Sequence, residues 1–156
     1  MRTWAGAWIV GLLIVVAGHA PAVAGDSLYG KVTEVRNAGL VILDYGKGTY
    51  AVRLIGIDAP TEGPPAAEAT SFVSKLVLGR NARIRFDHKA QNGEMVSQLL
   101  ADDPKTGVKD VGLELVRAGL ARKQQGYDYK YGELAAAEGE ARKAKRGLWA
   151  QTSQPK

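Results

Sequence analysis

The hydrophobic spacing of the chain changes period at Pro64 and Pro65, and this change limits the folds that the chain can adopt. Before the prolines, three short apolar segments cover residues 28–35, 40–43 and 49–57. The stretches between these segments contain the glycine, asparagine and aspartate residues that tight turns need. The sequence therefore predicts a three-stranded antiparallel meander before the prolines.

Behind the prolines, apolar residues follow the spacing of one helix face, which predicts a helix that ends at Gly79. These residues are Ala69, Phe72, Val73, Leu76 and Val77. Two more apolar segments, at 82–86 and 95–100, predict strands, and residues 111–121 and 131–149 have the pattern of helices. Five short strands and three helices predict the α+β class and a closed five-stranded β-barrel of the oligonucleotide-binding (OB) type.

The first 24 residues have the pattern of a secretory signal peptide. Arg2 is the only charged residue before Asp26, an apolar run follows it, and the small-residue sequence AVA ends at Ala24. We expect cleavage after Ala24 and export to the periplasm or out of the cell. The alternative is a membrane anchor, which needs roughly 20 uninterrupted apolar residues. A glycine, a histidine and a proline interrupt the run here.

Residues 25–150 are expected to form one domain, followed by a polar tail at 151–156. Loss of Arg2 with the signal peptide lowers the formal charge from +5 to +4, which permits an anionic partner without requiring one. The chain has no cysteine, so thiolate chemistry and zinc–thiolate sites are excluded. His88 is the only histidine of the expected domain, and we interpret it as a residue at the end of a strand.

Two charged residues interrupt the third apolar segment. Arg53 lies within it, and Asp58 follows it directly and precedes the sequence APTEGPP. One interpretation makes Arg53 an outward-facing strand residue and Asp58 a turn residue that accepts hydrogen bonds from nearby amides. The other interpretation makes both residues part of a site.

In order and spacing, the elements from Leu28 to Trp149 resemble the staphylococcal nuclease family, also called thermonuclease or TNase-like domains. VRLIGIDAP resembles the third strand of that family and the turn after it, AAEATSFVSKLV its first helix, and ELVRAGLA its second. The last helix is matched by Leu134, Glu138, Ala141, Arg142, Gly147, Leu148 and Trp149. The resemblance implies a calcium-dependent phosphodiesterase that acts on single-stranded DNA and RNA. In that family two aspartates and a backbone carbonyl hold calcium, a glutamate acts on the attacking water, and two arginines bind the phosphate.

The resemblance assigns two of these roles to residues of this chain. Arg53 would be the first phosphate-binding arginine, and Asp58 would be a calcium ligand with the Ala59 carbonyl beside it. Calcium prefers several oxygen ligands, and guanidinium groups pair with the charge that develops on a phosphodiester. These properties agree with the residue types at the two positions.

At the other family positions this chain departs from the pattern. Gly39 stands where the family has its second calcium aspartate, and Thr61 stands at the catalytic glutamate, with Glu62 one residue later. A displacement of about 1 Å can cost on the order of a hundredfold in rate. Glu62 is alternatively a loop charge or part of a helix start. Glu94 stands at the second arginine, where a carboxylate repels the bound anion; alternatively, it supplies the missing metal carboxylate.

Three tyrosines alternate in the segment GYDYKYG, namely Tyr127, Tyr129 and Tyr131. The family has two tyrosines in this neighbourhood that contact the nucleotide. One interpretation is that the rings stack on bases; the other is that they pack the loop against the last helix. The basic residues Arg142, Lys143, Lys145 and Arg146 are interpreted as a solvated helix face, with a nucleic-acid patch as the alternative.

The sequence therefore predicts an exported staphylococcal nuclease-like domain that is catalytically impaired or inactive. It is expected to keep part of a phosphate- and nucleic-acid-binding site and to be a monomer. An active calcium-dependent nuclease, rebuilt with Glu62 and Glu94, is the first alternative. A non-catalytic protein-interaction module in the cell envelope is the second. The expected partners are single-stranded nucleic acid or nucleotides, or an envelope protein, and Ca²⁺ is expected as a cofactor only for the active form.

Overall fold

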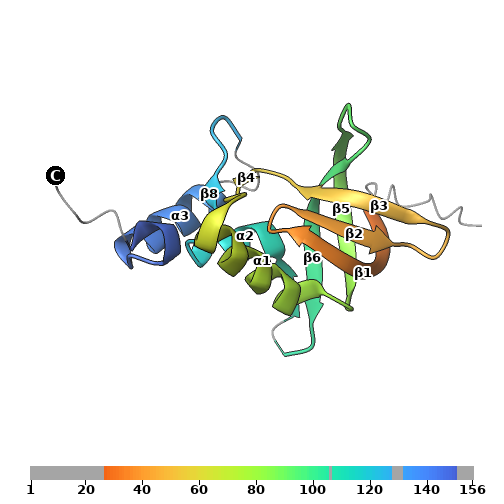
Figure 1. Ribbon diagram of the computed structural model, residues 1–156, viewed down its shortest axis with the longest axis horizontal. Helices are drawn as coiled ribbons and strands as arrows, with labels where there is room; N and C mark the ends of the chain where they lie inside the picture. The colour runs from red at the N-terminus through yellow and green to blue at the C-terminus, as the bar shows by residue number, and fades with distance from the viewer. Residues whose placement is uncertain (1–26, 106, 128–131, 151–156) are drawn as a thin grey trace, which may run out of the picture.

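The structure is a computed structural model that describes residues 27–105, 107–127 and 132–150. Its elements follow the α+β pattern predicted from the sequence (Figure 1). In chain order they are β1 (Ser27–Asn37), β2 (Leu40–Asp44), β3 (Thr49–Leu54), β4 (Ile57–Asp58), α1 (Gly63–Val77), β5 (Asn81–Lys89), β6 (Met95–Asp103), β7 (Gly107–Asp110), α2 (Val111–Arg117), β8 (Arg122–Lys123), α3 (Glu133–Lys143) and the 3₁₀ helix η1 (Gly147–Trp149).

Five strands close into a barrel, which confirms the predicted OB-type fold. The large sheet has the order β3-β2-β1-β5-β6-β7, and β3 also pairs with β6. This closing pair is parallel, with Val52 opposite Met95 and Leu54 opposite Ser97. Since the barrel consists of β1, β2, β3, β5 and β6, β7 only extends one edge of it.

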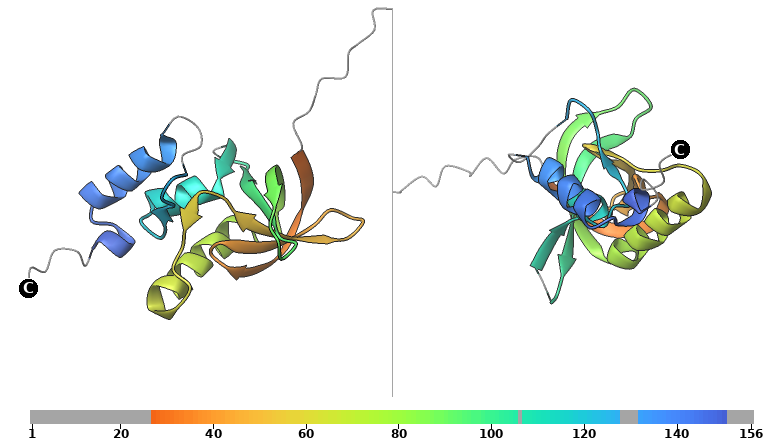
Figure 2. Two further views of the ribbon diagram at one scale, coloured as in Figure 1. Left: turned by 90° about the horizontal axis from the view of Figure 1, so that it is seen from above. Right: turned by 90° about the vertical axis from the view of Figure 1, so that its left-hand side faces the viewer.

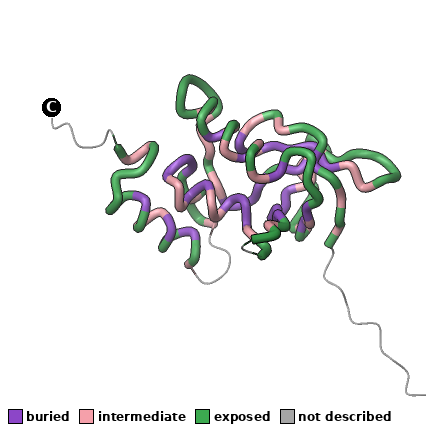
Figure 3. Tube along the Cα trace, turned by 90° about the horizontal axis from the view of Figure 1, so that it is seen from below, coloured by how far each residue is buried: buried purple, intermediate pink, exposed green. Residues whose placement is uncertain are grey.

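One hydrophobic core connects the barrel to the helices. Leu43, Ile84 and Leu99 are fully buried inside the barrel, and Val73 of α1 packs into the same cluster. Leu134 of α3 is also fully buried in this cluster. Figure 3 shows buried positions running from the strands through α1 and α2 into one face of α3. Figures 1 and 2 place α3 and η1 at the opposite end of the molecule from the β2–β3 hairpin.

The helices begin and end differently from the predicted limits. α1 begins at Gly63 and contains both prolines in its first turn, where a missing N–H costs no hydrogen bond. α2 ends at Arg117 because Gly119 has a φ of +74°, which a right-handed helix cannot include. The last helix was expected to reach Trp149, but α3 ends at Lys143 and the chain turns into η1 after it.

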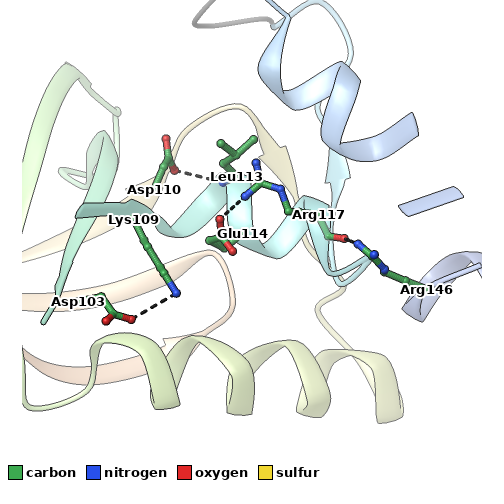
Figure 4. A network of polar contacts seen from close by, with 7 residues as sticks. All are labelled: Asp103, Lys109, Asp110, Leu113, Glu114, Arg117 and Arg146. Carbon is green, nitrogen blue, oxygen red and sulfur yellow. Dashed lines mark hydrogen bonds and ion pairs between the residues drawn. The ribbon is translucent and has the colours of Figure 1, made fainter. Parts of the chain in front are cut away.

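The α2–η1 connection is fixed by close backbone contacts. Leu148 N donates to Gly119 O at 2.9 Å. Arg146 Nη1 donates to Arg117 O at 3.1 Å (Figure 4). A Cβ at Gly119 would lie 2.3 Å from Arg146 O, and one at Gly147 would lie 2.4 Å from Gly119 O. The approach therefore requires glycine on both sides. At the other end of α2, Asp110 accepts a hydrogen bond from Leu113 N at 3.2 Å and caps the helix.

Three short strands were not predicted from the sequence. β7 pairs with β6, and β4 pairs with β8 in a separate two-stranded sheet. In the latter, Ile57 lies opposite Lys123 and Asp58 opposite Arg122. This pair joins the barrel to the segment between α2 and α3. Within the described residues, no helix is long and apolar enough to cross a membrane. The expected signal peptide lies outside the described residues.

Candidate functional site

A cleft of about 1090 Å³ lies between the barrel and the segment that contains β8, α3 and η1. It brings together positions that are far apart in the sequence. The residues singled out above that line it are Gly39, Arg53, Asp58, Ala59, Thr61, His88, Tyr127, Glu138, Arg142 and Trp149. Glu62 and Glu94 are not among its lining residues.

The turn between β1 and β2 forms one edge of this cleft. Gly39 N donates to Asn37 Oδ1 at 2.9 Å, and Leu54 N donates to Gly39 O at 2.9 Å. The turn is therefore tied to the end of β3. The φ of Gly39 is outside the left-handed region, and a Cβ there would meet only Asn37 Oδ1, at 3.6 Å. Packing does not exclude a side chain at Gly39, so the backbone would accept a carboxylate at this position.

Arg53 is paired with Glu94. Arg53 Nε lies 2.5 Å from Glu94 Oε2, and the two side chains are 45% and 14% exposed. The pair forms because β3 and β6 run parallel, which places Arg53 opposite Val96, two residues after Glu94. The hydrogen bond from Arg53 lowers the pKa of Glu94, against an opposing effect of burial. Glu94 is therefore ionised at neutral pH, and its charge compensates that of Arg53.

The two acidic residues near the start of α1 are placed differently. Asp58 is exposed in β4 and lines the cleft opposite the β8 strand. Glu62 is exposed and is the residue that precedes the first turn of α1, where its side chain makes no capping hydrogen bond. The structure therefore places Glu62 at the helix start, while Thr61 at the neighbouring position faces the cleft.

The described residues do not fit the calcium site that the resemblance implies. Asp58 and Glu138 are the carboxylates among the cleft-lining residues. Glu138 is already engaged, since its two oxygens lie 3.3 Å from Arg142 Nη2 and 3.3 Å from Lys123 N. In the described part of the chain, no group of three or more histidine, aspartate or glutamate side chains could hold a metal ion.

Tyr127 packs against the barrel end of the cleft. A Cβ at Gly56 would lie 2.6 Å from the Tyr127 ring and 3.1 Å from Leu134, so the ring covers this glycine. Burial raises the pKa of Tyr127, and the charge of Asp87 adds to the effect. The Tyr127 carbonyl accepts a hydrogen bond from Lys123 Nζ at 3.0 Å. Tyr129 and Tyr131 lie outside the described residues.

The wall formed by β8, α3 and η1 contains a cation–aromatic cluster. The sequence offered Arg142 as part of a nucleic-acid patch and Arg122 as a cation near the three tyrosines, but it did not predict that Trp149 joins them. The guanidinium carbons of Arg122 and Arg142 lie over the Trp149 ring, 5.3 Å and 4.1 Å from its centroid. Both arginines and the tryptophan line the cleft. The signal in the sequence was the cation pair Arg122–Lys123 directly after the second helix, but its partner in space lies 27 positions further along.

On the barrel side, His88 also lines the cleft, although the sequence suggested only a strand-end residue. It lies in the last part of β5, where the pairing with β6 is irregular between Phe86 and His88. Its Nδ1 is 2.7 Å from Asp87 Oδ2, and both side chains are at least half exposed. An exposed pair of neighbouring residues in this geometry is not held in one orientation by its surroundings.

Comparison with known proteins identifies the family. The sequence model described as "Staphylococcal nuclease homologue" matches residues 51–151. A protein of Verticillium alfalfae named probable endonuclease LCL3 is 37% identical over 114 residues, which are 65% of this chain and 39% of that protein. An uncharacterized endonuclease of Escherichia coli O157:H7 is 28% identical over 130 residues, 83% of this chain and 81% of that protein.

A third relative, probable endonuclease LCL3 of Yarrowia lipolytica, is 32% identical over 118 residues, 68% of this chain and 52% of that protein. This chain thus spans about half or less of the two fungal relatives and most of the bacterial one. The family match covers more than half of the chain and includes most of β3, all three helices and the cleft residues from Arg53 onward. The chain belongs to the staphylococcal nuclease family.

Proposed function

We propose that this domain binds single-stranded nucleic acid in its cleft and hydrolyses it poorly or not at all. The observation that carries the proposal is the Arg53–Glu94 ion pair. In the family pattern a second arginine stands at the position of Glu94, and both guanidinium groups bind the phosphate. Here Glu94 replaces one of the two arginines, and its carboxylate forms an ion pair with the other arginine, Arg53.

The charge of the cleft supports binding of a polyanion. Its lining contains the four cations Arg53, Arg122, Lys123 and Arg142 and the two carboxylates Asp58 and Glu138. A cleft with excess positive charge attracts nucleic acid through its phosphates, and this attraction weakens with salt. The three relatives are all named as probable or uncharacterized endonucleases, which supports nucleic acid as the ligand class.

The missing catalytic groups support impaired hydrolysis. Rate acceleration depends on groups that contact the developing charge and the attacking water in the transition state. At the family positions this chain has Gly39 instead of a metal carboxylate, Thr61 instead of the glutamate and Glu94 instead of the second arginine. Asp58 alone provides too few oxygens for a calcium ion, which takes 6–8 ligands of which carboxylates are the strongest.

The signal-peptide pattern of residues 1–24 supports export to the periplasm or the exterior as the setting of this function. A membrane-anchored form and an envelope-protein partner remain predictions from the sequence.

Cleavage and binding assays on the same protein test the proposal. A fluorescence-quenched single-stranded DNA and its RNA counterpart are incubated with the protein in calcium and then in chelator. We expect binding in both conditions and no calcium-dependent cleavage above that of a protein-free sample. Calcium-dependent cleavage that Asp58→Ala abolishes would establish the active nuclease instead, which the names of the relatives favour. Absence of any binding at low salt would reject the nucleic-acid function.

A further inference from the structure

The four cationic side chains of the cleft differ in the groups with which they already form ion pairs or hydrogen bonds. Arg53 is held by Glu94, and Arg142 Nη2 lies 3.3 Å from Glu138 Oε2. Lys123 Nζ donates to a backbone carbonyl at 3.0 Å. Within the described part of the chain, Arg122 has no carboxylate within ion-pair distance, and its guanidinium lies over the Trp149 ring. Among the described residues, Arg122 is therefore the cleft guanidinium that forms no ion pair, although Asp58 lies opposite it in the β4–β8 sheet.

Trp149 prepares Arg122 for binding an anion. A guanidinium that lies over an aromatic ring uses its flat face for that contact and leaves its N–H edge for hydrogen bonds. The indole also limits the conformations of the arginine before a ligand arrives, so less side-chain freedom is lost on binding. The guanidinium carbon of Arg142 lies over the same ring, 4.1 Å from its centroid, so two guanidinium groups share this wall and Glu138 pairs with one of them.

Both members of the Arg122–Trp149 pair are anchored to the rest of the fold. Arg122 lies in β8 opposite Asp58, and Gln124 N donates to Gly56 O at 3.0 Å, which fixes β8 against the barrel. Trp149 ends η1, which is attached to the end of α2 through the Leu148–Gly119 hydrogen bond. The wall is therefore a fixed surface of the cleft rather than a pair of loose side chains.

We propose that Arg122, whose guanidinium lies over the Trp149 ring, is the principal phosphate contact for a nucleic-acid strand in this cleft, in place of Arg53. This inference rests on the nucleic-acid binding proposed above and assigns it to a different wall. The strand lies along the β8–α3 side, where the compensated Arg53 contributes less than Arg122. The ligand class is a single-stranded polynucleotide bound through its backbone.

Tryptophan emission reports directly on this wall. The sequence contains three tryptophans, and the full-length chain with Trp4→Phe and Trp8→Phe keeps only Trp149. Oligothymidylate titrated into this protein should change the emission as it binds. Arg122→Gln should weaken binding about tenfold, as expected for loss of a charged hydrogen bond. It should also reduce the slope of log K against log salt by about 0.7, the value for one phosphate of a single strand.

Three further variants separate this role from a structural one. Arg122→Lys keeps the charge without the flat guanidinium and should give intermediate affinity. Arg53→Gln should weaken binding less than Arg122→Gln does. Lys143→Gln is the matched control, because Lys143 is an exposed cation of α3 that does not line the cleft, and we expect less than a twofold effect. Thermal unfolding of every variant verifies that the fold is intact.

The outcomes distinguish the two proposals. If the parent protein binds the oligonucleotide but Arg122→Gln behaves like Lys143→Gln, or Arg53→Gln is the more damaging change, the assignment to Arg122 is wrong while nucleic-acid binding stands. If an Arg122→Gln protein that is as stable as the parent loses affinity without a change in the salt slope, the phosphate contact is refuted. If the parent protein does not bind, both proposals fail.

Discussion

Substitution of Glu94 by glutamine should make the domain bind single-stranded nucleic acid more tightly. Counting Glu94, four cations of the cleft face three carboxylates, so Glu94→Gln raises the net charge there from +1 to +2. Arg53 is then available to a phosphate. A hydrogen bond from a charged group contributes about 1.5–3 kcal/mol. Because the Arg53 side chain is 45% exposed, we expect the lower end, about 1.5 kcal/mol or roughly tenfold in Kd.

The assay is fluorescence anisotropy of a labelled oligothymidylate, measured between about 50 and 200 mM salt. Glu94→Gln should lower Kd and steepen the salt dependence by about 0.7 in slope. Asp102→Asn is the control, because it removes one exposed negative charge at the other end of β6. Equal effects of the two substitutions would mean that only overall charge matters. An unchanged Kd for Glu94→Gln would refute the argument that Glu94 compensates Arg53.

Three other predictions follow from the structure. Gly39→Asp should let calcium stabilise the domain, because the new carboxylate would face the same cleft as Asp58. At a calcium concentration of about ten times its Kd, the free energy of unfolding should rise by about 1.4 kcal/mol. Thermal unfolding measures this gain, and the parent protein should show none. The pKa of Glu94 is lower in the folded protein than in the unfolded chain. Its pairing with Arg53 therefore stabilises the fold at pH values above those at which a free glutamate titrates. The stability difference between the parent and Glu94→Gln should therefore be constant near neutrality, begin to fall as the pH drops below the free-glutamate range of about 4.3, and be lost once the pH has passed through the lower pKa of the folded state. Denaturant titrations at each pH measure it, and a difference that grew in acid would contradict it. Leu134→Ala should cost about 2–5 kcal/mol in urea unfolding, since the side chain is fully buried, and a loss below about 1 kcal/mol would show that α3 contributes little to the core.

The barrel and its helices could be predicted because their patterns are local. Alternation, turn residues and the stripe that includes Val73 are properties of neighbouring positions, and they gave the order and type of the main elements. β4 and β8 have two residues each, which is too short for any alternation. They exist because the barrel and the segment after α2 meet in space, so their pairing depends on tertiary structure.

The cleft was predictable only in part, for a related reason. The resemblance placed Gly39, Arg53 and Asp58 at one site, and all three line the cleft. It also identified Glu94 as a reversed charge, but the hydrogen bond to Arg53 spans 41 positions and depends on how β3 and β6 close the barrel. The position of Trp149 in the wall formed by β8, α3 and η1 depends in turn on where the last helix ends. Its early end puts Trp149 on η1, and a continuous helix would have placed the ring elsewhere.

The glycine contact between α2 and η1 makes the cleft wall formed by β8, α3 and η1 sensitive to proteolytic removal of residues from the C-terminal side. Residues after Lys143 contribute no member of the buried core, which extends only to Ala141 among the described residues. Carboxypeptidase digestion back to Lys143 would therefore leave the barrel folded, yet it would remove Trp149 and expose the carbonyl groups of Arg117 and Gly119. A chain shortened in this way would still unfold cooperatively, but it would no longer bind nucleic acid. In a protease-rich environment, the time for which the domain can bind would then be set by the integrity of η1 rather than by the unfolding free energy of the domain.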